Sequence, residues 1–350
     1  MTLKMFASDN NSGIHPAILE AIAEANSGHA PAYGADSYTA DAIRKFKEHF
    51  GEECEVLFVF NGTGANVTGL KAMVRSHQAI ICTNGAHIHA DEGGAAEGFI
   101  GGKLLTVPSL DGKLTIEGIA EQLHHIGNQQ RSQPKAVSIS QCTELGTVYT
   151  IEEIKAITSF AHANGLYVHM DGARLSNAAA YLGCTFKEMT VDAGVDMLAF
   201  GGTKNGLMLG EAVVCFNKAL ASELTYIRKQ GMQLGSKMRF IATQFERLLT
   251  DDLWLENARH ANRMAQLLAD GLQKFPDTAL TQPVESNAVF ISLPIEQIGQ
   301  LQKTYAFALW NSAINEIRLV TSFDTTEEDI HEFLSHIEKP IPKHKNHFSD

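Results

Sequence analysis

Cysteine is sparse in this sequence and follows no recognisable pattern. The five cysteines stand at positions 54, 82, 142, 184 and 215, and no two of them form a Cys-x-x-Cys pair. An odd and scattered set argues against a disulfide framework and against a zinc knuckle. We therefore expect a protein of the reducing cytoplasm.

Long hydrophobic runs are also missing. No uninterrupted apolar stretch approaches the ~20 residues that a membrane-spanning helix requires. The first residues, Met-Thr-Leu-Lys-Met-Phe-Ala-Ser-Asp, contain no apolar segment typical of a signal peptide. We expect neither a membrane span nor a secretion signal.

Positive charge is in short supply. The chain has 28 lysines and arginines against 40 aspartates and glutamates, which gives a formal net charge of −12. Nucleic acids and anionic membrane surfaces are therefore poor candidates as partners. A small anionic molecule remains compatible with this charge, because a local cluster of arginines can bind it.

Short apolar strands alternate with helices over the first two thirds of the chain. This alternation is typical of an α/β domain with a mainly parallel sheet. Strands are expected at 56–60, 79–82, 104–107, 136–140, 166–170, 197–200 and 212–216. Helices are expected at 17–25, 39–50, 62–75, 116–125, 151–164 and 176–181.

The pattern changes near residue 220. Long helical stretches are expected at 218–250 and 254–274, strands at 288–293 and 318–322, and a last helix at 327–336, before a tail that looks frayed after Lys339. The 350 residues are enough for two domains that share a cleft. We expect a large domain over 1–250, which includes an N-terminal arm, and a small α+β domain over 251–350.

A glycine-rich turn follows the first expected strand. Gly62, Thr63 and Gly64 open a helix, so their backbone amides and the helix dipole can hold an anion such as a phosphate. The positions of the following Gly69 and Lys71 fit neither the dinucleotide fingerprint nor the P-loop. The turn is thus either a phosphate-binding site for a ligand that this motif does not identify, or a tight connection between strand and helix without a binding function.

Two charged residues stand at the ends of neighbouring strands. Asp171 ends the apolar strand 166–170, and Lys204 follows the strand 197–200 after Gly201-Gly202. In open α/β sheets, ligands bind beyond the carboxyl ends of the strands. The two residues could form a simple salt bridge, or they could share a ligand, in which case the paired glycines would leave room for it.

One cofactor requires all three features. Pyridoxal phosphate needs an anion site for its phosphate, a carboxylate beside its ring nitrogen and a lysine amine for its aldehyde. His87 follows the strand 79–82 at the same edge, where a side chain could stack on the cofactor ring. Arg318 interrupts an apolar strand and could bind a substrate carboxylate, with the Ser8 hydroxyl as a second contact. No spacing of a metal site is present, because His331 and His336 are five residues apart.

Taken together, the motifs resemble those of the low-specificity L-threonine aldolases, which are pyridoxal-phosphate lyases of the aspartate-aminotransferase fold (fold type I). The resemblance spans nearly the whole chain and depends on six segments, at 6–9, 32–34, 60–63, 86–87, 169–174 and 200–205. It implies a seven-stranded α/β domain with a smaller C-terminal α+β domain, and a homotetramer whose sites are shared between subunits.

The resemblance also implies roles for single residues. Lys204 would form the Schiff base, Asp171 would contact the ring nitrogen, and His87 would stack on the ring. Gly62 and Thr63 would hold the phosphate, and Arg239 would reach the phosphate of a neighbouring subunit. The residues implied at the substrate are Ser8, Tyr33, Arg174 and Arg318, with Arg174 also at the phenolic oxygen of the cofactor.

This chain departs from some family members at one position. Where they carry a histidine proposed to act on the β-hydroxyl group, residues 141–146 read Gln-Cys-Thr-Glu-Leu-Gly. The base could be His87, His89, Glu144 or a bound water molecule. The expected reaction is reversible cleavage of L-threonine, L-allo-threonine or a related β-hydroxy amino acid to glycine and an aldehyde. The alternatives are a β-eliminating lyase or an aminotransferase on the same fold, or a binding protein without catalysis.

Overall fold

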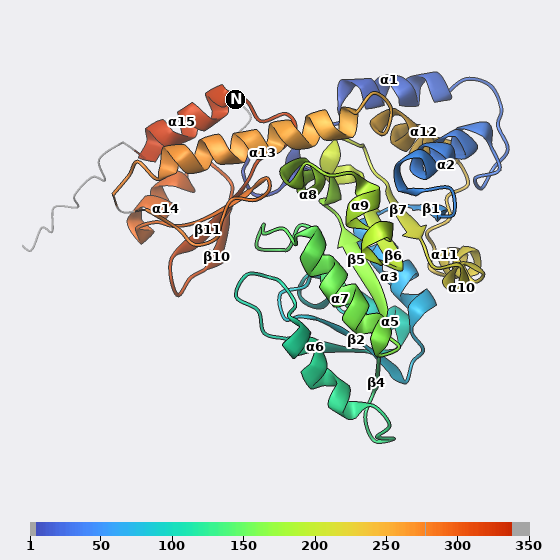
Figure 1. Cartoon of the computed structure of the whole chain (residues 1–350). Coiled ribbons are helices and arrows are strands. Elements are labelled where there is room, and N and C mark those ends of the chain that lie inside the picture. The colour runs from blue at the N-terminus through green and yellow to red at the C-terminus, as the bar shows by residue number, and fades with distance from the viewer. Residues whose placement is uncertain (1–4, 277, 338–350) are drawn as a thin grey trace, which may run out of the picture.

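A seven-stranded sheet forms the centre of the larger unit in this computed structural model, which describes residues 5–276 and 278–337 (Figure 1). The strand order is β1-β7-β6-β5-β4-β2-β3. The five strands from β3 to β6 run parallel, whereas β7 runs antiparallel to both of its neighbours. The bounds are β1 Glu55–Val59, β2 Gln78–Thr83, β3 Lys103–Val107, β4 Gln133–Ser140, β5 Tyr167–Gly172, β6 Met197–Gly201 and β7 Glu211–Cys215. The prediction of a mainly parallel seven-stranded sheet is confirmed.

Helices cover both faces of this sheet, because its strands are apolar on both sides. In Figure 1, α7 lies in front of the sheet, with α3 and α5 behind it. The helices up to β7 are α1 Pro16–Ala25, α2 Ser37–Phe50, α3 Gly62–Met73, α4 His87–Ala90, α5 Ala95–Ile100, α6 Ile116–Gln122, α7 Ile151–Ala163, α8 Leu175–Leu182 and α9 Phe186–Met189. Three of these helices, α4, α5 and α9, were not predicted.

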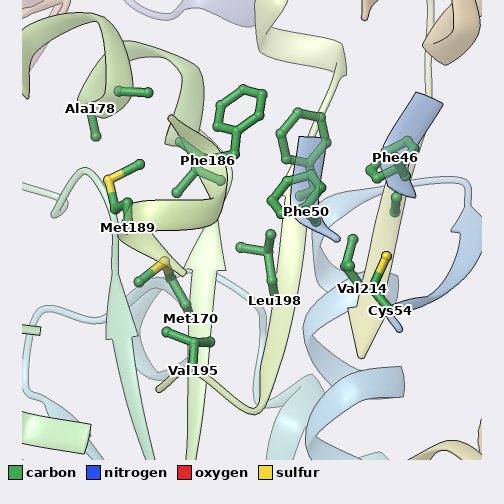
Figure 2. Close-up of a cluster of buried hydrophobic side chains, with 14 of the residues drawn as sticks. Phe46, Phe50, Cys54, Met170, Ala178, Phe186, Met189, Val195, Leu198 and Val214 are labelled. Carbon is green, nitrogen blue, oxygen red and sulfur yellow. The ribbon is translucent and has the colours of Figure 1, made fainter. Parts of the chain in front are cut away.

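The core on one face is built around aromatic rings. Phe50 stacks on Phe186 with 5.3 Å between ring centroids and an interplanar angle of 6°. Phe46 meets the edge of Phe200 from β6 at 5.3 Å. Figure 2 shows this cluster with Leu198 and Val214 from neighbouring strands directed toward it. Packing of this kind fixes the position of β6, whose end carries the lysine discussed below.

The stretch 218–250 is not the long helix that we predicted. It forms three helices, α10 Lys218–Ala221, α11 Leu224–Gln230 and α12 Arg239–Leu248. Gly231 follows α11, and Met232 takes a φ of 62°, which no α-helix can accommodate. The intervening segment then lies against β1, where a Cβ at Gly235 would stand 2.9 Å from the ring of Phe60.

A four-stranded antiparallel sheet, in the order β10-β11-β9-β8, forms the smaller unit (Figure 1). Its elements are α13 Leu253–Leu272, β8 Ala279–Leu280, β9 Ala288–Ser292, α14 Ile295–Leu301, β10 Ala308–Asn311, β11 Glu316–Val320 and α15 Glu327–Ile337. The elements β8, β10 and α14 were not predicted, and the tail after Lys339 lies outside the described residues.

The N-terminal segment joins the two units. The backbone amide of Phe6 donates to the carbonyl of Ala306, and the amide of Val320 donates to the carbonyl of Phe6, both at 2.8 Å. Phe6 itself is buried in the core of the smaller unit. Residues 7–9 are thereby held between the two sheets. Among residues 5–276 and 278–337, no helix combines the length and apolar character needed to cross a bilayer.

Candidate active site

A cavity lies at the carboxyl ends of the parallel strands, where ligands bind in open α/β sheets. The side chains and turns around it come from segments far apart in the sequence. Its lining consists of Gly62, Asn66, His87, Glu92, Ser140, Cys142, Glu144, Asp171, Ala173, Arg174 and Lys204. Six residues that the sequence singled out are therefore brought together: Gly62, His87, Glu144, Asp171, Arg174 and Lys204.

Lys204 reaches this cavity from a short 3-10 turn, Thr203–Asn205, directly after β6. Its side chain is half-buried. The positive charge of nearby Arg174, followed by burial, lowers the pKa of the Lys204 amine. A lowered pKa increases the neutral fraction of the amine, which is the form that can attack a carbonyl carbon.

The glycines before Lys204 serve the packing of the protein itself. A Cβ at Gly201 would stand 2.3 Å from the carbonyl oxygen of Ala173, and a Cβ at Gly202 would stand 2.4 Å from a methyl group of Leu207. The Gly202 amide donates to Oε2 of buried Glu211 at 2.6 Å. We expected these glycines to leave room for a cofactor, and that expectation is wrong, because protein atoms already occupy the space.

Asp171 ends β5 beside Lys204 and is buried. Its Oδ1 accepts from the Ala173 amide at 3.0 Å, and its Oδ2 accepts from Nδ2 of Asn66 at 2.9 Å. β5 pairs with β6 in parallel, with Asp171 opposite Ala199. The sheet therefore fixes the carboxylate one strand away from the lysine.

A hydrogen-bonded network connects Asp171 to His87. Nδ2 of Asn66 also donates to Oε1 of Glu92 at 2.9 Å, and Nδ1 of His87 lies 3.0 Å from the same oxygen. The hydrogen bond to Glu92 raises the pKa of His87. Asn66 lies in the helix expected at 62–75, but no spacing in the sequence indicates that its amide joins two carboxylates.

His87, Glu92 and Asp171 also qualify by geometry as a metal-binding group, because one ligand atom of each lies within 4.8 Å of the others. These atoms are already engaged: Nδ2 of Asn66 donates to both carboxylates, and His87 contacts Glu92. The hydrogen bonds account for the cluster without a cation.

Arg174 is fixed by a second carboxylate that the sequence did not reveal. Its Nε and Nη2 atoms donate to the two oxygens of Asp9, at 2.7 and 2.9 Å, and Asn287 donates to Oδ2 of Asp9 at 3.0 Å. Burial acts to raise the pKa of Asp9, but the charge and hydrogen bonds of Arg174 outweigh it and lower the pKa to about 2. Two of the donors that Arg174 could offer a substrate are thus already used.

The Asp9–Arg174 pair makes the stability of the fold depend on pH. The pKa of Asp9 falls from 3.8 to about 2 on folding, so this carboxylate contributes about 2 kcal/mol to the free energy of unfolding above pH 4. The contribution is lost as the pH falls from about 4 through 2, because the unfolded chain then binds the proton first. Urea unfolding of the wild type and of Asp9→Asn should therefore differ most at neutral pH and converge toward pH 2. A difference that stays constant over this range would contradict the assignment.

Arg318 in β11 is a cation without an acidic partner among the described residues. Its Nη2 donates to the carbonyl of Ala7 at 3.3 Å, its Nε is buried without a partner, and its guanidinium lies 4.6 Å from the centre of the Trp310 ring. Burial, followed by the charge of Arg174, lowers the pKa of Arg318. The half-buried Ser8 follows Ala7 directly. A half-buried guanidinium with an unused donor is suited to bind a carboxylate.

The first turn of α3 is the candidate phosphate site. Asn61 caps the helix, accepting from the Gly64 amide at 2.7 Å, which leaves the Gly62 and Thr63 amides without partners inside the helix. No atom lies within 4 Å of the position that a Cβ of Gly62 would take. Thr63 lines a neighbouring cavity on the outer side of this helix, together with Gln233.

Tyr33 and Arg239 do not line the cavity. Tyr33 is exposed, with Lys229 5.3 Å from its ring centre. Nη1 of Arg239 donates to the carbonyls of Ser27 and Gly28 at 3.4 and 3.3 Å. Within one chain, neither side chain touches the residues around Lys204.

The cavity fits pyridoxal phosphate in the chemistry of its donors. An amine of lowered pKa and a buried carboxylate stand at the ends of adjacent strands, and Gly62, whose helix amide is open, lies at the cavity wall. Buried atoms around it, Oδ1 of Asn66 and Oε2 of Glu92, have no hydrogen-bond partner. Unpaired buried polar atoms indicate a site that a polar ligand completes.

Comparison with known proteins gives consistent results. Residues 5–295 match the model of the beta-eliminating lyase family. The chain is 44% identical over 339 residues to the low specificity L-threonine aldolase of Pseudomonas aeruginosa, covering 95% of this chain and 97% of that protein. It is 26% identical over 332 residues to the low specificity L-threonine aldolase of Escherichia coli, covering 91% and 94%.

Solved structures agree. The threonine aldolase of Leishmania major superposes with a TM-score of 0.90 at 33% identity, covering 95% of this chain and 98% of that one. Aspartate aminotransferase from Thermus thermophilus superposes with a TM-score of 0.68 at 17% identity, covering 95% and 91%, which establishes the shared fold alone. The chain thus belongs to the beta-eliminating lyase family and, within it, to the pyridoxal-phosphate-dependent threonine aldolases.

Proposed function

We propose that this chain cleaves L-threonine and L-allo-threonine reversibly to glycine and acetaldehyde, and that it accepts related β-hydroxy-α-amino acids such as phenylserine. The chain belongs to the threonine aldolase group, and within that group one observation supports this proposal. The half-buried amine of Lys204, the buried carboxylate of Asp171 and the imidazole of His87 line one cavity at the sheet edge.

Several of the residues around the cavity would hold the cofactor. Lys204 would bind it covalently through its amine, Asp171 would keep the ring nitrogen protonated, and His87 would lie against the ring. The amides of Gly62 and Thr63, with the Thr63 hydroxyl, bind the phosphate. The cofactor, when bound, supplies an acceptor for the electron pair that is released at Cα of the substrate.

The arginines orient the substrate. Arg318, with its unused Nε, binds the substrate carboxylate, and the Ser8 hydroxyl adds a contact. Arg174 keeps Nη1 for the phenolic oxygen of the cofactor and the adjacent end of the substrate, because its other donors hold Asp9. A substrate carboxylate that is held in one position determines which of the bonds to Cα is oriented for cleavage.

We further propose a homotetramer in which Arg239 and Tyr33 act at the site of a neighbouring subunit. Both residues lie outside the cavity of their own chain, and exposed apolar side chains such as Met232 and Tyr226 surround this region. The division into 1–250 and 251–350 is supported by the break between α12 and α13. The five unpaired cysteines support a cytoplasmic location. Sedimentation velocity at micromolar concentration tests the tetramer, and a monomer would contradict it.

The activity is tested with purified holoenzyme and a panel of L-threonine, L-allo-threonine, L-phenylserine and L-serine. We expect aldehyde and glycine in equal amounts from the first three amino acids, measured with alcohol dehydrogenase for acetaldehyde and by absorbance for benzaldehyde. L-Serine with a keto-acid assay distinguishes β-elimination, and release of keto acid or ammonia without aldehyde would favour that reaction instead. No aldehyde from any member of the panel would contradict the proposal.

A further inference from the structure

Glu144 is a carboxyl group at the cavity wall to which the roles above assign nothing. Its Oε1 accepts from the Ser140 hydroxyl and from the His87 amide, both at 2.7 Å. Its Oε2 is buried and has no hydrogen-bond partner. Ser140, His87 and Glu144 all line the cavity into which Lys204 projects. The carboxyl group is therefore held firmly through one oxygen while the other stays unpaired.

We propose that Glu144 is the base that takes the proton from the β-hydroxyl group of the substrate, an inference that rests on the proposed function. In the cleavage direction the substrate O–H bond breaks and the proton passes to the Glu144 carboxylate. The electron pair of that bond forms the carbonyl of the aldehyde product, while the pair of the Cα–Cβ bond remains on Cα. In the reverse direction the Glu144 carboxyl returns the proton to the new alkoxide oxygen.

The surroundings of Glu144 suit both directions. Burial raises the pKa of this carboxyl group, against the lowering effect of its hydrogen bonds with Ser140 and His87. A raised pKa makes the ionised form a stronger base. Rotation of the carboxylate about its last bond exchanges its two oxygens, so either of them can face the cavity.

The other candidates for the base are less suited. Nδ1 of His87 is engaged with Glu92, and this contact raises the pKa of His87, which favours the protonated form. His89 is exposed and does not line the cavity. Glu92 also lines the cavity and has an unpaired Oε2, but its Oε1 contacts His87 and is tied to Asp171 through Asn66. Glu144 combines a place at the cavity with an unpaired oxygen, and no hydrogen bond ties it to Asp171 through Asn66.

The test is Glu144→Gln, because glutamine keeps an oxygen for the Ser140 hydroxyl and the His87 amide but cannot take the proton. Two reactions of the holoenzyme are compared: acetaldehyde release from L-threonine, and exchange of a glycine Cα proton in D₂O followed by NMR. Exchange needs the cofactor and the carboxylate contacts but no β-hydroxyl group. We expect kcat for threonine to fall about 100-fold while glycine exchange stays within about threefold.

Two further variants make the result decisive. Glu285→Gln is the matched control, since Glu285 is half-buried and accepts from the Val148 amide at 2.7 Å outside the cavity. It should leave both reactions unchanged. Glu144→Asp keeps a carboxylate but places it one methylene further back, so kcat for threonine should fall to an intermediate value while glycine exchange is unchanged. This variant also replaces Glu144→Gln as the test if Glu144→Gln does not fold.

The outcomes separate the inference from the proposed function. A wild type that releases no aldehyde from any β-hydroxy amino acid overturns the proposed function itself. With an active wild type, unchanged threonine cleavage in Glu144→Gln would show that another group is the base. An equal fall of cleavage and exchange would show that Glu144 only maintains the shape of the site. Either of these two results overturns the role of Glu144 and leaves the proposed function standing.

Discussion

Replacement of Lys204 by alanine should abolish turnover of L-threonine, with a fall in kcat on the order of 10⁴-fold or more. Lys204 supplies the only amine that lines the cavity among the described residues. Nearby Arg174 and burial lower the pKa of this amine, which increases the neutral fraction that can act as a nucleophile. The loss should appear in kcat, because the carboxylate contacts of the substrate remain.

A second measurement for Lys204→Ala does not depend on activity. Borohydride treatment of the wild-type holoenzyme, followed by digestion and mass spectrometry, should find the cofactor mass on the peptide that contains Lys204. The matched control is Lys135→Ala, which removes a half-buried lysine near the amino-terminal end of β4, where its Nζ donates to the carbonyl oxygen of Gly165. This control should keep full activity and the labelled peptide. A labelled peptide elsewhere, or turnover by Lys204→Ala, would refute the assignment of the lysine.

The sequence was sufficient to predict the residues at strand ends. Lys204 and Asp171 could be found because each follows a short apolar run, and the carboxyl ends of parallel strands meet at one edge by topology alone. The seven strands of the large sheet were predicted for the same reason, since alternation of apolar strands with helices is a local property of the chain. The antiparallel direction of β7 could not be predicted in this way, because the direction of a strand depends on how the segment before it folds back.

The contacts between distant segments could not be predicted. Asp9 and Arg174 are 165 residues apart, and nothing near either position shows that they form a buried bidentate pair. The same applies to Asn66, which joins Asp171 to Glu92 from a helix that lies across the sheet. Such partners follow from the packed structure, in which every buried charge and amide must find a neighbour.

The glycines before Lys204 also show that the sequence does not identify which distant segment makes a contact. We expected Gly201 and Gly202 to leave room for a ligand, but protein atoms make the close approach there. The approaching group is the backbone of Ala173, which belongs to the turn that follows Asp171. The two strand ends are therefore fixed against each other by direct contact, which keeps the lysine and the carboxylate at a constant separation.

Replacement of Asp171 by asparagine should lower kcat on the order of 10³-fold, because the amide cannot keep the cofactor ring nitrogen protonated. Asparagine would still accept from the Ala173 amide at Oδ1, so the turn after β5 stays in place. Its amide nitrogen, however, would face Nδ2 of Asn66, which now donates to Oδ2 of Asp171 at 2.9 Å. The variant therefore loses a hydrogen bond as well as a charge, and about 1–3 kcal/mol of stability with it.

Asn66→Ala separates these two effects. It removes the same hydrogen bond but leaves the carboxylate of Asp171 in place, so we expect a similar loss of stability with a much smaller loss of kcat. The free energy of unfolding in urea and kcat for L-threonine are measured for both variants at the same pH. A ring nitrogen that has lost its proton should also shift the visible absorption of the bound cofactor in Asp171→Asn but not in Asn66→Ala. Equal kcat values in the two variants would mean that Asp171 acts only through its hydrogen bond with Asn66. That result would contradict the assignment of the Asp171 carboxylate to the ring nitrogen.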